Sequence, residues 1–275
     1  MADIAPLADG EFVLFQRLIY RIAGISLSDA KKILLVGRLS RRVQHYGFST
    51  FAQYYRLLAS GNHADEVQVM VDLLTTNETY FFREPKHFEL LREQALAARK
   101  RAQAFRVWSA ASSSGEEAYS IAMVLADCLQ GDPWDVIGSD ISARVLQRAR
   151  AGHYLIERTQ HIPHSYLQRF CLKGFGDQEG TLLVERSLRA RVQFMQVNLN
   201  APLPRLGTFD VIFLRNVLIY FNAETKRQVV GRVLSLLKPG GHFCIGHSES
   251  LNGITDAVLP LAPSIYSKPQ ADAAR

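Results

Sequence analysis

The stretch from Thr75 to Glu84, TTNETYFFRE, places hydrogen-bonding side chains, three aromatic rings and an arginine next to one another. Such residues could end a helix, connect two domains or contact a ligand. An arginine can hold a carboxylate through two parallel N–H···O bonds. The residue types therefore allow recognition of an anionic group, and the rest of the sequence must decide between helix end, hinge and site.

Small and acidic residues follow the first apolar segment that we expect to be a strand. The run from Ser109 to Glu117, SAASSSGEE, would let the backbone approach a ligand closely at Gly115. It is neither a G-x-G-x-x-G pattern nor a Walker loop, because no Gly-Lys-Ser/Thr follows. Glu116 and Glu117 would repel a phosphate. Acids in a first helical turn are, however, also common as partners of the helix dipole.

Polar residues also end the next expected strands. An acid at the position of Asp140 can accept both hydroxyls of a ribose, or it can cap a helix that begins near Ser142. With Asn198 in VNLN, the pattern fits an adenosine cofactor without a pyrophosphate, and S-adenosylmethionine is the obvious candidate. Nicotinamide dinucleotides fit less well, because a pyrophosphate needs helix N–H groups free of negative charge.

A fourth apolar segment runs into FLRNVLIYF, which brings Arg215 and Asn216 to its end and Tyr220 about one turn later. An arginine in an apolar run is costly unless it is paired or solvated. Either a structural ion pair or a ligand contact would explain it. Both readings place Arg215 at the same edge of the expected sheet as Asp140.

Histidines and cysteines indicate no metal site. His161 and His164 flank a proline without an acid or cysteine cluster. The adjacent residues His247, Ser248 and Glu249 have the types of a hydrolase triad but cannot align as one. The cysteines are odd in number and form no C-x-x-C pattern, so small packing residues are expected at Cys128, Cys171 and Cys244.

Two hydrophobic patterns divide the 275 residues. Apolar residues recur at helical spacing before residue 75, and expected helices there are 12–24, 29–45, 50–60 and 65–74. Strands then alternate with helices, which predicts a parallel, doubly wound sheet. The expected strands are 105–109, 134–140, 192–197, 209–214, 242–246 and 265–268. The expected helices of this part are 86–103, 116–129, 143–151 and 223–237.

These patterns predict an α/β protein preceded by an all-α part. We expect a helical bundle domain at 1–75, a linking block with a connecting helix at 76–104 and the sheet domain at 105–268. Glycines around an expected strand at 181–185 predict a small antiparallel β-subdomain at about 154–191. Residues 269–275 are expected to be a flexible tail.

Composition and charge narrow the class of protein. Hydrophobic residues make up 48% and charged residues 21%, as in ordinary globular proteins. No apolar run reaches the roughly 18 residues of a membrane span, and the N-terminus lacks a signal-peptide pattern. We therefore expect a cytoplasmic protein without membrane insertion. The net charge of +6 is concentrated near the N-terminus, which would attract an acidic partner.

The ordered set of motifs resembles the chemotaxis receptor glutamate methyltransferases, the CheR type. TTNETYFFRE, VWSAASSSGEEAYSIAM, SDIS, VNL, FLRNVLIYF, LKPGG and GHSES occur in order and at matching spacing between about Phe12 and Ser267. The resemblance implies a Rossmann-like methyltransferase sheet with a β-subdomain, behind an all-α domain. It also implies S-adenosylmethionine as cofactor and methyl esters of receptor glutamates as product.

The resemblance further implies roles for single residues. Glu117, rather than its neighbour Glu116, would meet the methionine amino group, and Asp140 the ribose. Asn198 and Leu199 would lie by the adenine. The implied cofactor-binding residues are Asn77, Thr79, Arg83, Glu117, Asp140, Asn198, Leu199, Arg215 and Asn216.

Arg83 and Tyr220 are the positions that the resemblance places nearest the transferred methyl group, and we expect them to be catalytic. A glutamate carboxylate, with an unperturbed pKa of about 4.3, is already ionised at neutral pH. The reaction then needs positioning rather than a general base. Within TTNETYFFRE, we expect the aromatic residues to pack the two domains together.

The expected partner is the cytoplasmic helical bundle of chemoreceptors, and the enzyme is expected to be a monomer. A basic helix is a plausible docking face, with outward Lys31, Lys32, Arg38, Arg41 and Arg42, although a solvated surface would give the same pattern. A nucleic-acid methyltransferase would need stacking or groove-reading patterns that are missing. Intact Arg83, Asp140, Arg215 and Tyr220 argue against a non-catalytic cofactor sensor, whereas a small-molecule carboxyl methyltransferase stays as an alternative. Whether loop 174–180 binds a receptor tail peptide is left open.

Overall fold

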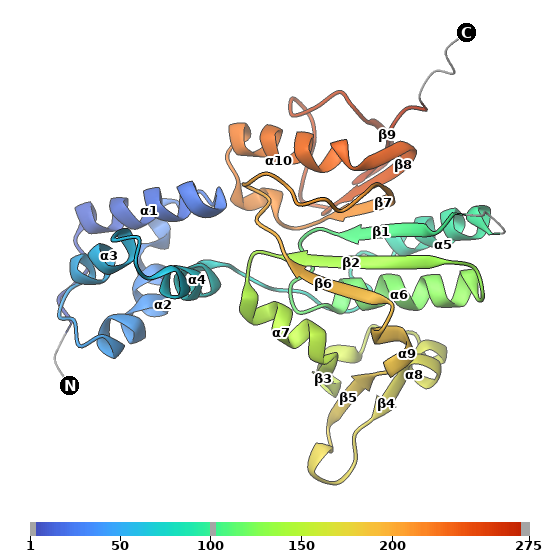
Figure 1. The fold of residues 1–275 in the computed structure, drawn as a ribbon, viewed down its shortest axis with the longest axis horizontal. Helices are drawn as coiled ribbons and strands as arrows, with labels where there is room; N and C mark the ends of the chain where they lie inside the picture. Colours follow the sequence, from blue (N-terminus) through green and yellow to red (C-terminus); the bar gives the residue numbers. More distant parts are fainter. Residues whose placement is uncertain (1–3, 100–102, 271–275) are drawn as a thin grey trace.

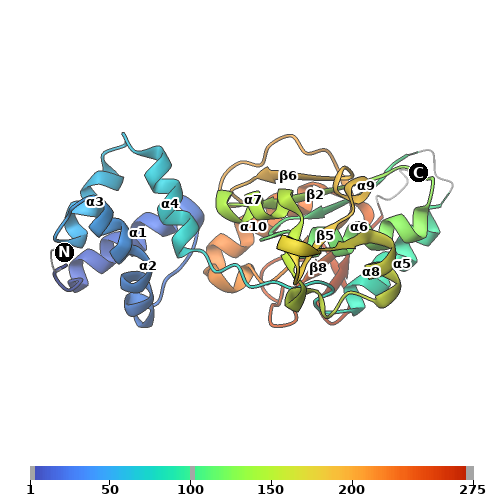
Figure 2. The same cartoon turned by 90° about the horizontal axis from the view of Figure 1, so that it is seen from below.

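The computed structural model describes residues 4–99 and 103–270 of the chain. A group of helices comes first, and an extended segment then leads to a sheet flanked by helices (Figure 1). Figure 2 shows the same two parts from below, with the extended segment running from one to the other. No helix in the described ranges has the length and apolar character needed to cross a membrane.

The helical part contains α1 (Asp9–Ala23), α2 (Lys32–His45), α3 (Phe51–Ala59) and α4 (Ala64–Leu74). Gly24 ends α1 in the left-handed region at φ 71°, which glycine adopts without steric cost. Thr50 accepts the N–H of Gln53 and begins α3. Phe15 is fully buried and contacts the rings of Phe51 and Tyr54. The expected helices are present, and α2 follows a 3₁₀ turn over Asp29–Lys31.

One mixed sheet contains β1 (Phe105–Ser109), β2 (Trp134–Asp140), β6 (Val192–Gln196), β7 (Phe209–Leu214), β8 (Leu237–Ile245), β9 (Leu259–Ala262) and β10 (Ile265–Ser267). The strand order is β6-β2-β1-β7-β8-β10-β9. The pairs from β6 to β8 are parallel, whereas β10 is antiparallel to its neighbours. The predicted α/β doubly wound sheet is therefore present.

Side chains of the central strands alternate between two cores. Val107 of β1 and Phe213 of β7 pack on the side of α5 (Lys86–Ala98) and α6 (Glu116–Leu129). Trp108 and Ile212 point to the opposite side, which α10 (Ala223–Ser235) covers. Figure 1 shows α10 and α6 on opposite faces of the sheet. Burial on both faces explains the nearly continuous apolar strands in the sequence.

The insertion after α7 (Ala143–Ala151) forms a second, three-stranded sheet, as expected. Its strands are β3 (His153–Leu155), β4 (Cys171–Lys173) and β5 (Thr181–Val184), all antiparallel in the order β3-β5-β4. Its helices are α8 (His164–Phe170) and α9 (Arg186–Arg189). This sheet lies below the main one in Figure 1, beyond α6 and α7.

Several expected boundaries were wrong. Strand β8 begins at Leu237, so the Pro239-Gly240-Gly241 stretch lies inside a strand instead of following a helix. Strand β9, which pairs with β10, was not expected, because it is only four residues long and contains Pro260, which is unfavourable inside a strand. Helix α5 ends at Ala98 and not at residue 103, since Arg99 adopts an extended backbone. The remainder of that boundary, and most of the expected tail, fall on residues 100–102 and 271–275, outside the described residues.

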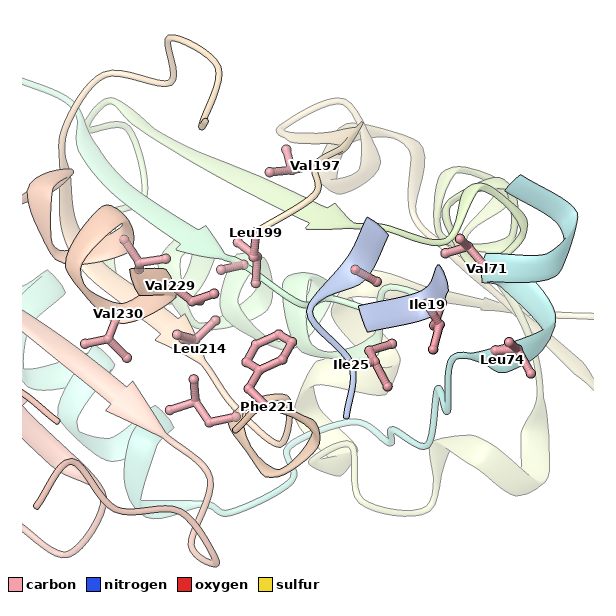
Figure 3. Packing of buried hydrophobic residues seen from close by; sticks show 14 of the residues in the cluster. Ile19, Ile25, Val71, Leu74, Val197, Leu199, Leu214, Phe221, Val229 and Val230 are labelled. Carbon is pink, nitrogen blue, oxygen red and sulfur yellow. The ribbon is translucent and has the colours of Figure 1, made fainter. Parts of the chain in front are cut away.

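The segment after α1 packs against the sheet part. Ile25 forms an isolated antiparallel bridge with Phe221, and Figure 3 shows these two side chains next to each other. The Ser26 N–H donates to the Tyr220 carbonyl over 2.8 Å. The Asn198 amide donates to the Ile22 carbonyl over 2.7 Å. The helical part is thus bonded to the carboxyl-end edge of the sheet and is not only tethered by the extended segment.

Candidate active site

The extended segment Thr75–Glu84 is fixed at both ends. Arg38 of α2 donates to the carbonyls of Leu74 and Thr75 over 3.0 and 3.1 Å. At the other end, the Phe82 N–H donates to the Ser120 hydroxyl over 3.0 Å. Helix α4 ends at Leu74, immediately before the segment. The segment is therefore a hinge between the two parts, held in one course by specific hydrogen bonds.

The aromatic residues of this segment do not pack the two parts together, so that expectation was wrong. Phe81 is fully buried against Tyr154, and Phe82 contacts the rings of Phe88 and Tyr166. Tyr80 lies against the ring of His161. All of these partners belong to the sheet part or its β-subdomain. The three aromatic residues therefore attach the segment to the sheet part, whereas the helical part contacts the segment through other residues.

The loop after β1 packs tightly at Gly115, which does not line the cavity described below, so the expected approach of a ligand to Gly115 is not seen. Gly115 has φ 98°, and a Cβ there would meet the Ala149 Cβ at 2.9 Å. Ser113 also has a positive φ, and its N–H donates to Asp140 over 2.9 Å. The Ser142 N–H donates to the other Asp140 oxygen, also over 2.9 Å. Asp140 therefore braces two loops and keeps free lone pairs for further donors.

Asp140 is buried and does not cap the following helix. Ser142 is the residue that caps α7, through its hydroxyl. Burial raises the pKa of Asp140 to about 6, against the lowering effect of the Ser142 and Ser113 N–H groups. A carboxylate in this position is suited to accept hydroxyl hydrogens, as a ribose would offer them.

Arg215 lies between two carboxylates at the end of β7. Its Nη1 is 2.8 Å from Glu117 Oε2, and its Nη2 is 2.9 Å from Glu84 Oε2. Nη2 also donates to the Arg83 carbonyl. Burial opposes the charge of Arg215, but Glu117 and Glu84 raise its pKa. Burial likewise opposes the charge of Glu84, but Arg215 lowers the pKa of that carboxyl. The two readings of Arg215 are therefore compatible, since it is both ion-paired and part of the cavity wall.

The adjacent acids Glu116 and Glu117 face different surroundings. Glu116 is fully buried, accepts a hydrogen bond from the Ser114 hydroxyl and lies 2.7 Å from Arg158 of the β-subdomain. Burial raises its pKa. Glu117 accepts from Ser109 over 2.7 Å and lines the cavity described next. Of the two acids, Glu117 is the one that a ligand in the cavity would meet.

A cavity of 470 Å³ lies between the helical part and the carboxyl ends of the strands. All the site residues expected from the sequence line it, although they come from five separate stretches: Asn77, Thr79, Arg83, Glu117, Asp140, Asn198, Leu199, Arg215, Asn216 and Tyr220. The Arg83 guanidinium is partly exposed and donates to the Glu78 carbonyl over 3.2 Å. The structure thus brings together every residue that the motifs singled out.

Sequence reasoning missed the wall that the helical part contributes. Ile25, Leu27, Lys31, Leu34 and Arg38 line the same cavity. The short run after Gly24 belongs to no periodic element, so its apolar residues gave no signal for this position. Their proximity to Tyr220 follows from the Ile25–Phe221 bridge, which is a long-range contact.

The basic helix differs from the expected outward face. Arg42 is bonded to Glu66 through Nε at 2.8 Å, Arg38 holds the hinge, and Lys32 lies 2.6 Å from Asp9. Lys31 and Arg41 are exposed. On its apolar side, α2 buries Leu35, Leu39 and Val43, whereas Ile33 is 85% exposed.

The fold and the cavity define a Rossmann-like methyltransferase with an all-α domain in front. Two family models match the chain: "CheR methyltransferase, all-alpha domain" over residues 10–75, and "CheR methyltransferase, SAM binding domain" over residues 77–264. The chain belongs to the CheR methyltransferase family. It is therefore an S-adenosylmethionine-dependent protein-glutamate O-methyltransferase, as the motifs predicted.

Curated relatives agree with this assignment. The chain is 43% identical over 270 residues to the chemotaxis protein methyltransferase of Escherichia coli K12, covering 97% of this chain and 93% of that one. It is 40% identical over 260 residues to chemotaxis protein methyltransferase 2 of Pseudomonas aeruginosa, covering 94% and 92%. The match therefore extends over both parts of the chain.

Solved structures are similar to the chain only at low TM-scores. The N-methyltransferase NodS of Bradyrhizobium japonicum in complex with S-adenosyl-L-homocysteine gives a TM-score of 0.39 at 13% identity, covering 68% of this chain and 88% of that one. TrmN of Thermus thermophilus gives 0.42 at 17% identity, covering 68% and 49%. These scores are low, and the assignment rests on the family models and the curated relatives.

Proposed function

We propose that this cavity transfers the methyl group of S-adenosylmethionine to glutamate side chains on the cytoplasmic helical bundle of chemoreceptors. The observation that carries the proposal is the convergence of all the motif residues on one cavity at the carboxyl ends of the strands. Ligands of doubly wound sheets bind at this edge. Formation of glutamate methyl esters would reset receptor signalling, the adaptation step of a chemosensory pathway.

The residues of the cavity suit the cofactor. The small residues Ala110 and Ala111 line the cavity after β1, and Asp140 offers two acceptor oxygens for ribose hydroxyls. Glu117 supplies a negative charge for an amino group, and Asn198 and Leu199 line the cavity and are proposed to contact the adenine. Bound S-adenosylmethionine supplies an electrophilic methyl group. Asn77, Thr79 and Asn216 complete the polar lining.

Arg83 and Tyr220 are proposed to hold the substrate. The Arg83 guanidinium is 29% exposed and reaches the cavity, so it can bind a carboxylate through two donors. The Tyr220 hydroxyl can donate one further hydrogen bond. Since a glutamate is already ionised at neutral pH, these residues need only orient it. Alignment of this kind can lower a barrier by roughly 7–11 kcal/mol.

The receptor is proposed to dock beside the cavity, on the exposed cations of the basic helix. Lys31 lines the cavity and Arg41 is exposed. The other three cations of the expected face, Arg38, Arg42 and Lys32, make contacts within the protein. The proposed docking face is therefore reduced to Lys31, Arg41 and their neighbours. Electrostatic attraction would then speed the encounter with an acidic receptor surface. We propose a cytoplasmic monomer as the working form.

Each part of the chain is proposed to have its own role. Residues 1–75 form the docking domain, and residues 76–104 form the hinge with its connecting helix. Residues 105–268 form the catalytic domain, into which the β-subdomain at about 154–191 is inserted, and residues 269–275 form a tail. The bounds of the two family models, 10–75 and 77–264, support the first division.

Incubation with labelled S-adenosylmethionine and a panel of receptor cytoplasmic fragments tests the function. We expect label on receptor protein that is released by mild base, as methyl esters are. Fragments whose candidate glutamates are changed to alanine should stay unlabelled. Base-stable label, or label on small carboxylic acids or RNA but on no receptor fragment, would contradict the proposal.

A further inference from the structure

His87 of α5 is fully buried beside the active site, and its hydrogen-bonding state follows from its neighbours. Its Nε2 lies 2.8 Å from the Ser264 hydroxyl oxygen. The Ser264 hydroxyl itself donates to the Pro263 carbonyl over 2.6 Å. We assign the ring proton to Nε2, because the Ser264 hydroxyl then donates to the Pro263 carbonyl while its oxygen accepts from His87. The other ring nitrogen, Nδ1, then presents a lone pair.

The lone pair of His87 Nδ1 has no hydrogen-bond partner among the residues the structure describes. It lies 3.5 Å from Glu84 Oε2, an oxygen that already accepts from Arg215. His247 Nε2 is 3.9 Å from the same oxygen. The ligand atoms of these three residues all lie within 4.8 Å of one another. The buried Nδ1 atom is thus an acceptor without a donor, and a cation held between it and the Glu84 carboxylate would satisfy it.

We propose that Glu84 Oε2, His87 Nδ1 and His247 Nε2 bind a divalent transition-metal ion of the zinc class. Two imidazoles and one carboxylate are a ligand set that Zn²⁺ favours. Tetrahedral bonds of about 2.0–2.1 Å place ligand atoms roughly 3.3 Å apart. The Glu84 and His87 atoms are already near this separation. The His247 side chain is 52% exposed and can rotate inward.

Two further features fit such an ion. Ser264 accepts from the far nitrogen of His87, as partners of metal-bound imidazoles commonly do, and fixes the ring. The local charge also favours a bound cation. Arg215 is paired with both Glu84 and Glu117, and these three side chains together carry one net negative charge. The exposed side of His247 leaves a coordination position open to solvent.

The ion would act as an inhibitor. Glu84 Oε2 is also the oxygen that Arg215 Nη2 contacts at 2.9 Å. An ion on this oxygen competes with Arg215, which also holds Glu117 and the carbonyl of Arg83. Occupancy would loosen two residues of the proposed cofactor and substrate site. This consequence rests on the proposed function, whereas the ion site itself does not.

Direct binding to the metal-free protein tests the site. We expect calorimetry with Zn²⁺ to show one strong site, and Co²⁺ in its place to give the intense visible absorption of a tetrahedral complex. His247→Ala should weaken binding by at least about 10-fold, with an unchanged melting temperature because the side chain is half exposed. His164→Ala, an exposed histidine elsewhere, is the matched control and should bind as the unmodified protein does.

Equal affinity in His247→Ala and the unmodified protein, or a weak octahedral Co²⁺ spectrum, would overturn the site. Loss of methyl transfer on addition of Zn²⁺, reversed by a chelator and absent in His247→Ala, is expected for the inhibitory role. Metal binding is measured without turnover. The binding result therefore stays interpretable even if the proposed methylation of receptors does not occur. Tight binding without any effect on turnover would overturn the inhibitory role alone.

Discussion

The carboxylate of Asp72, in α4, accepts the backbone N–H of Ala143 over 3.0 Å. It also lies within 3.3 Å of the Arg144 N–H, so a residue of the helical part caps α7 of the sheet part. Gln68, one turn earlier in α4, donates to the Ile141 carbonyl over 3.0 Å. The loop that begins at Asp140 is thus positioned from outside its own domain. The family sequences imply a role for Asp140, but only the structure reveals this support.

We expect Asp72→Ala to weaken cofactor binding. Loss of a helix cap costs about 0.5–2 kcal/mol. Part of this energy should be lost from cofactor binding, because the Asp140 loop is no longer held in place, so we expect the affinity to fall by up to about 10-fold. Isothermal titration with S-adenosylhomocysteine measures it. Asp65→Ala, an exposed acid of the same helix, is the control. A lower melting temperature with unchanged affinity would show that Asp72 only stabilises the fold.

The affinity for the cofactor should fall as the pH falls through about 6. Burial raises the pKa of Asp140 to about 6, so that acid protonates the carboxyl and removes acceptor capacity for the ribose. Above pH 7 the affinity should be level. Asp140→Asn should bind weakly and without this pH dependence. An equal pH dependence in Asp140→Asn would assign the titration to another group.

The same pKa has a consequence for stability. The folded-state value lies above the unfolded value of about 3.9, so the native state binds the proton first as the pH falls. The Asp140 contribution is therefore unfavourable above pH 6, and this cost decreases between pH 6 and 4. The free energy of unfolding of the ligand-free protein and of Asp140→Asn, measured at pH 6 and at pH 4, gives the size of this contribution.

Arg83→Ala should reduce turnover far more than cofactor affinity. Removal of a donor that acts on the reacting groups typically costs about 10²–10³ in kcat. We expect the titrated affinity for S-adenosylhomocysteine to change by less than about 5-fold. Arg83→Lys keeps the positive charge but not the two parallel N–H donors of the guanidinium, so its turnover should lie between those of Arg83→Ala and the unmodified enzyme. Turnover equal to that of the unmodified enzyme would exclude the proposed role.

The buried Arg42–Glu66 pair should stabilise the helical part. Glu66 is 5% exposed and also accepts from Tyr54 over 2.6 Å. Removal of one partner from a buried pair costs about 3–5 kcal/mol, and the partial exposure of Arg42 should reduce this to about 2 kcal/mol for Glu66→Gln. Urea unfolding measures the change. Asp65→Asn, the exposed neighbour, should alter the unfolding free energy by less than about 0.5 kcal/mol.

Charge reversal of Arg41 tests receptor docking without these internal contacts. Arg41→Glu should slow receptor methylation by several-fold at low salt, with the difference shrinking as salt screens the surface. Cofactor affinity should be unchanged. Arg38→Glu is a poor test, because it also breaks the bonds to the hinge carbonyls of Leu74 and Thr75. A salt-independent defect in Arg41→Glu would argue against electrostatic docking.

Sequence patterns located the strands, and the polar residues that line the cavity, for a shared physical reason. Buried parallel strands leave continuous apolar runs, and polar residues at their ends, such as Asp140 and Arg215, must then face a common edge. Residues without a periodic context were beyond such reasoning. Leu27 and Lys31 line the cavity only because of long-range packing, and the direction of Arg38 depends on where the hinge carbonyls lie. The short strand β9 contains a proline and is exposed, so its four apolar residues did not indicate a strand.

The cavity wall is shared by two segments of chain that the hinge alone connects in sequence. A ligand that contacts both Lys31 on one side and Asp140 on the other is therefore bound only while the two parts are together. Its binding energy, about 2.7 kcal/mol at 100 times Kd, is added to their junction. If S-adenosylmethionine makes both contacts, it acts as a non-covalent crosslink, and proteolytic nicking within Thr75–Glu84 should slow as the cofactor concentration rises.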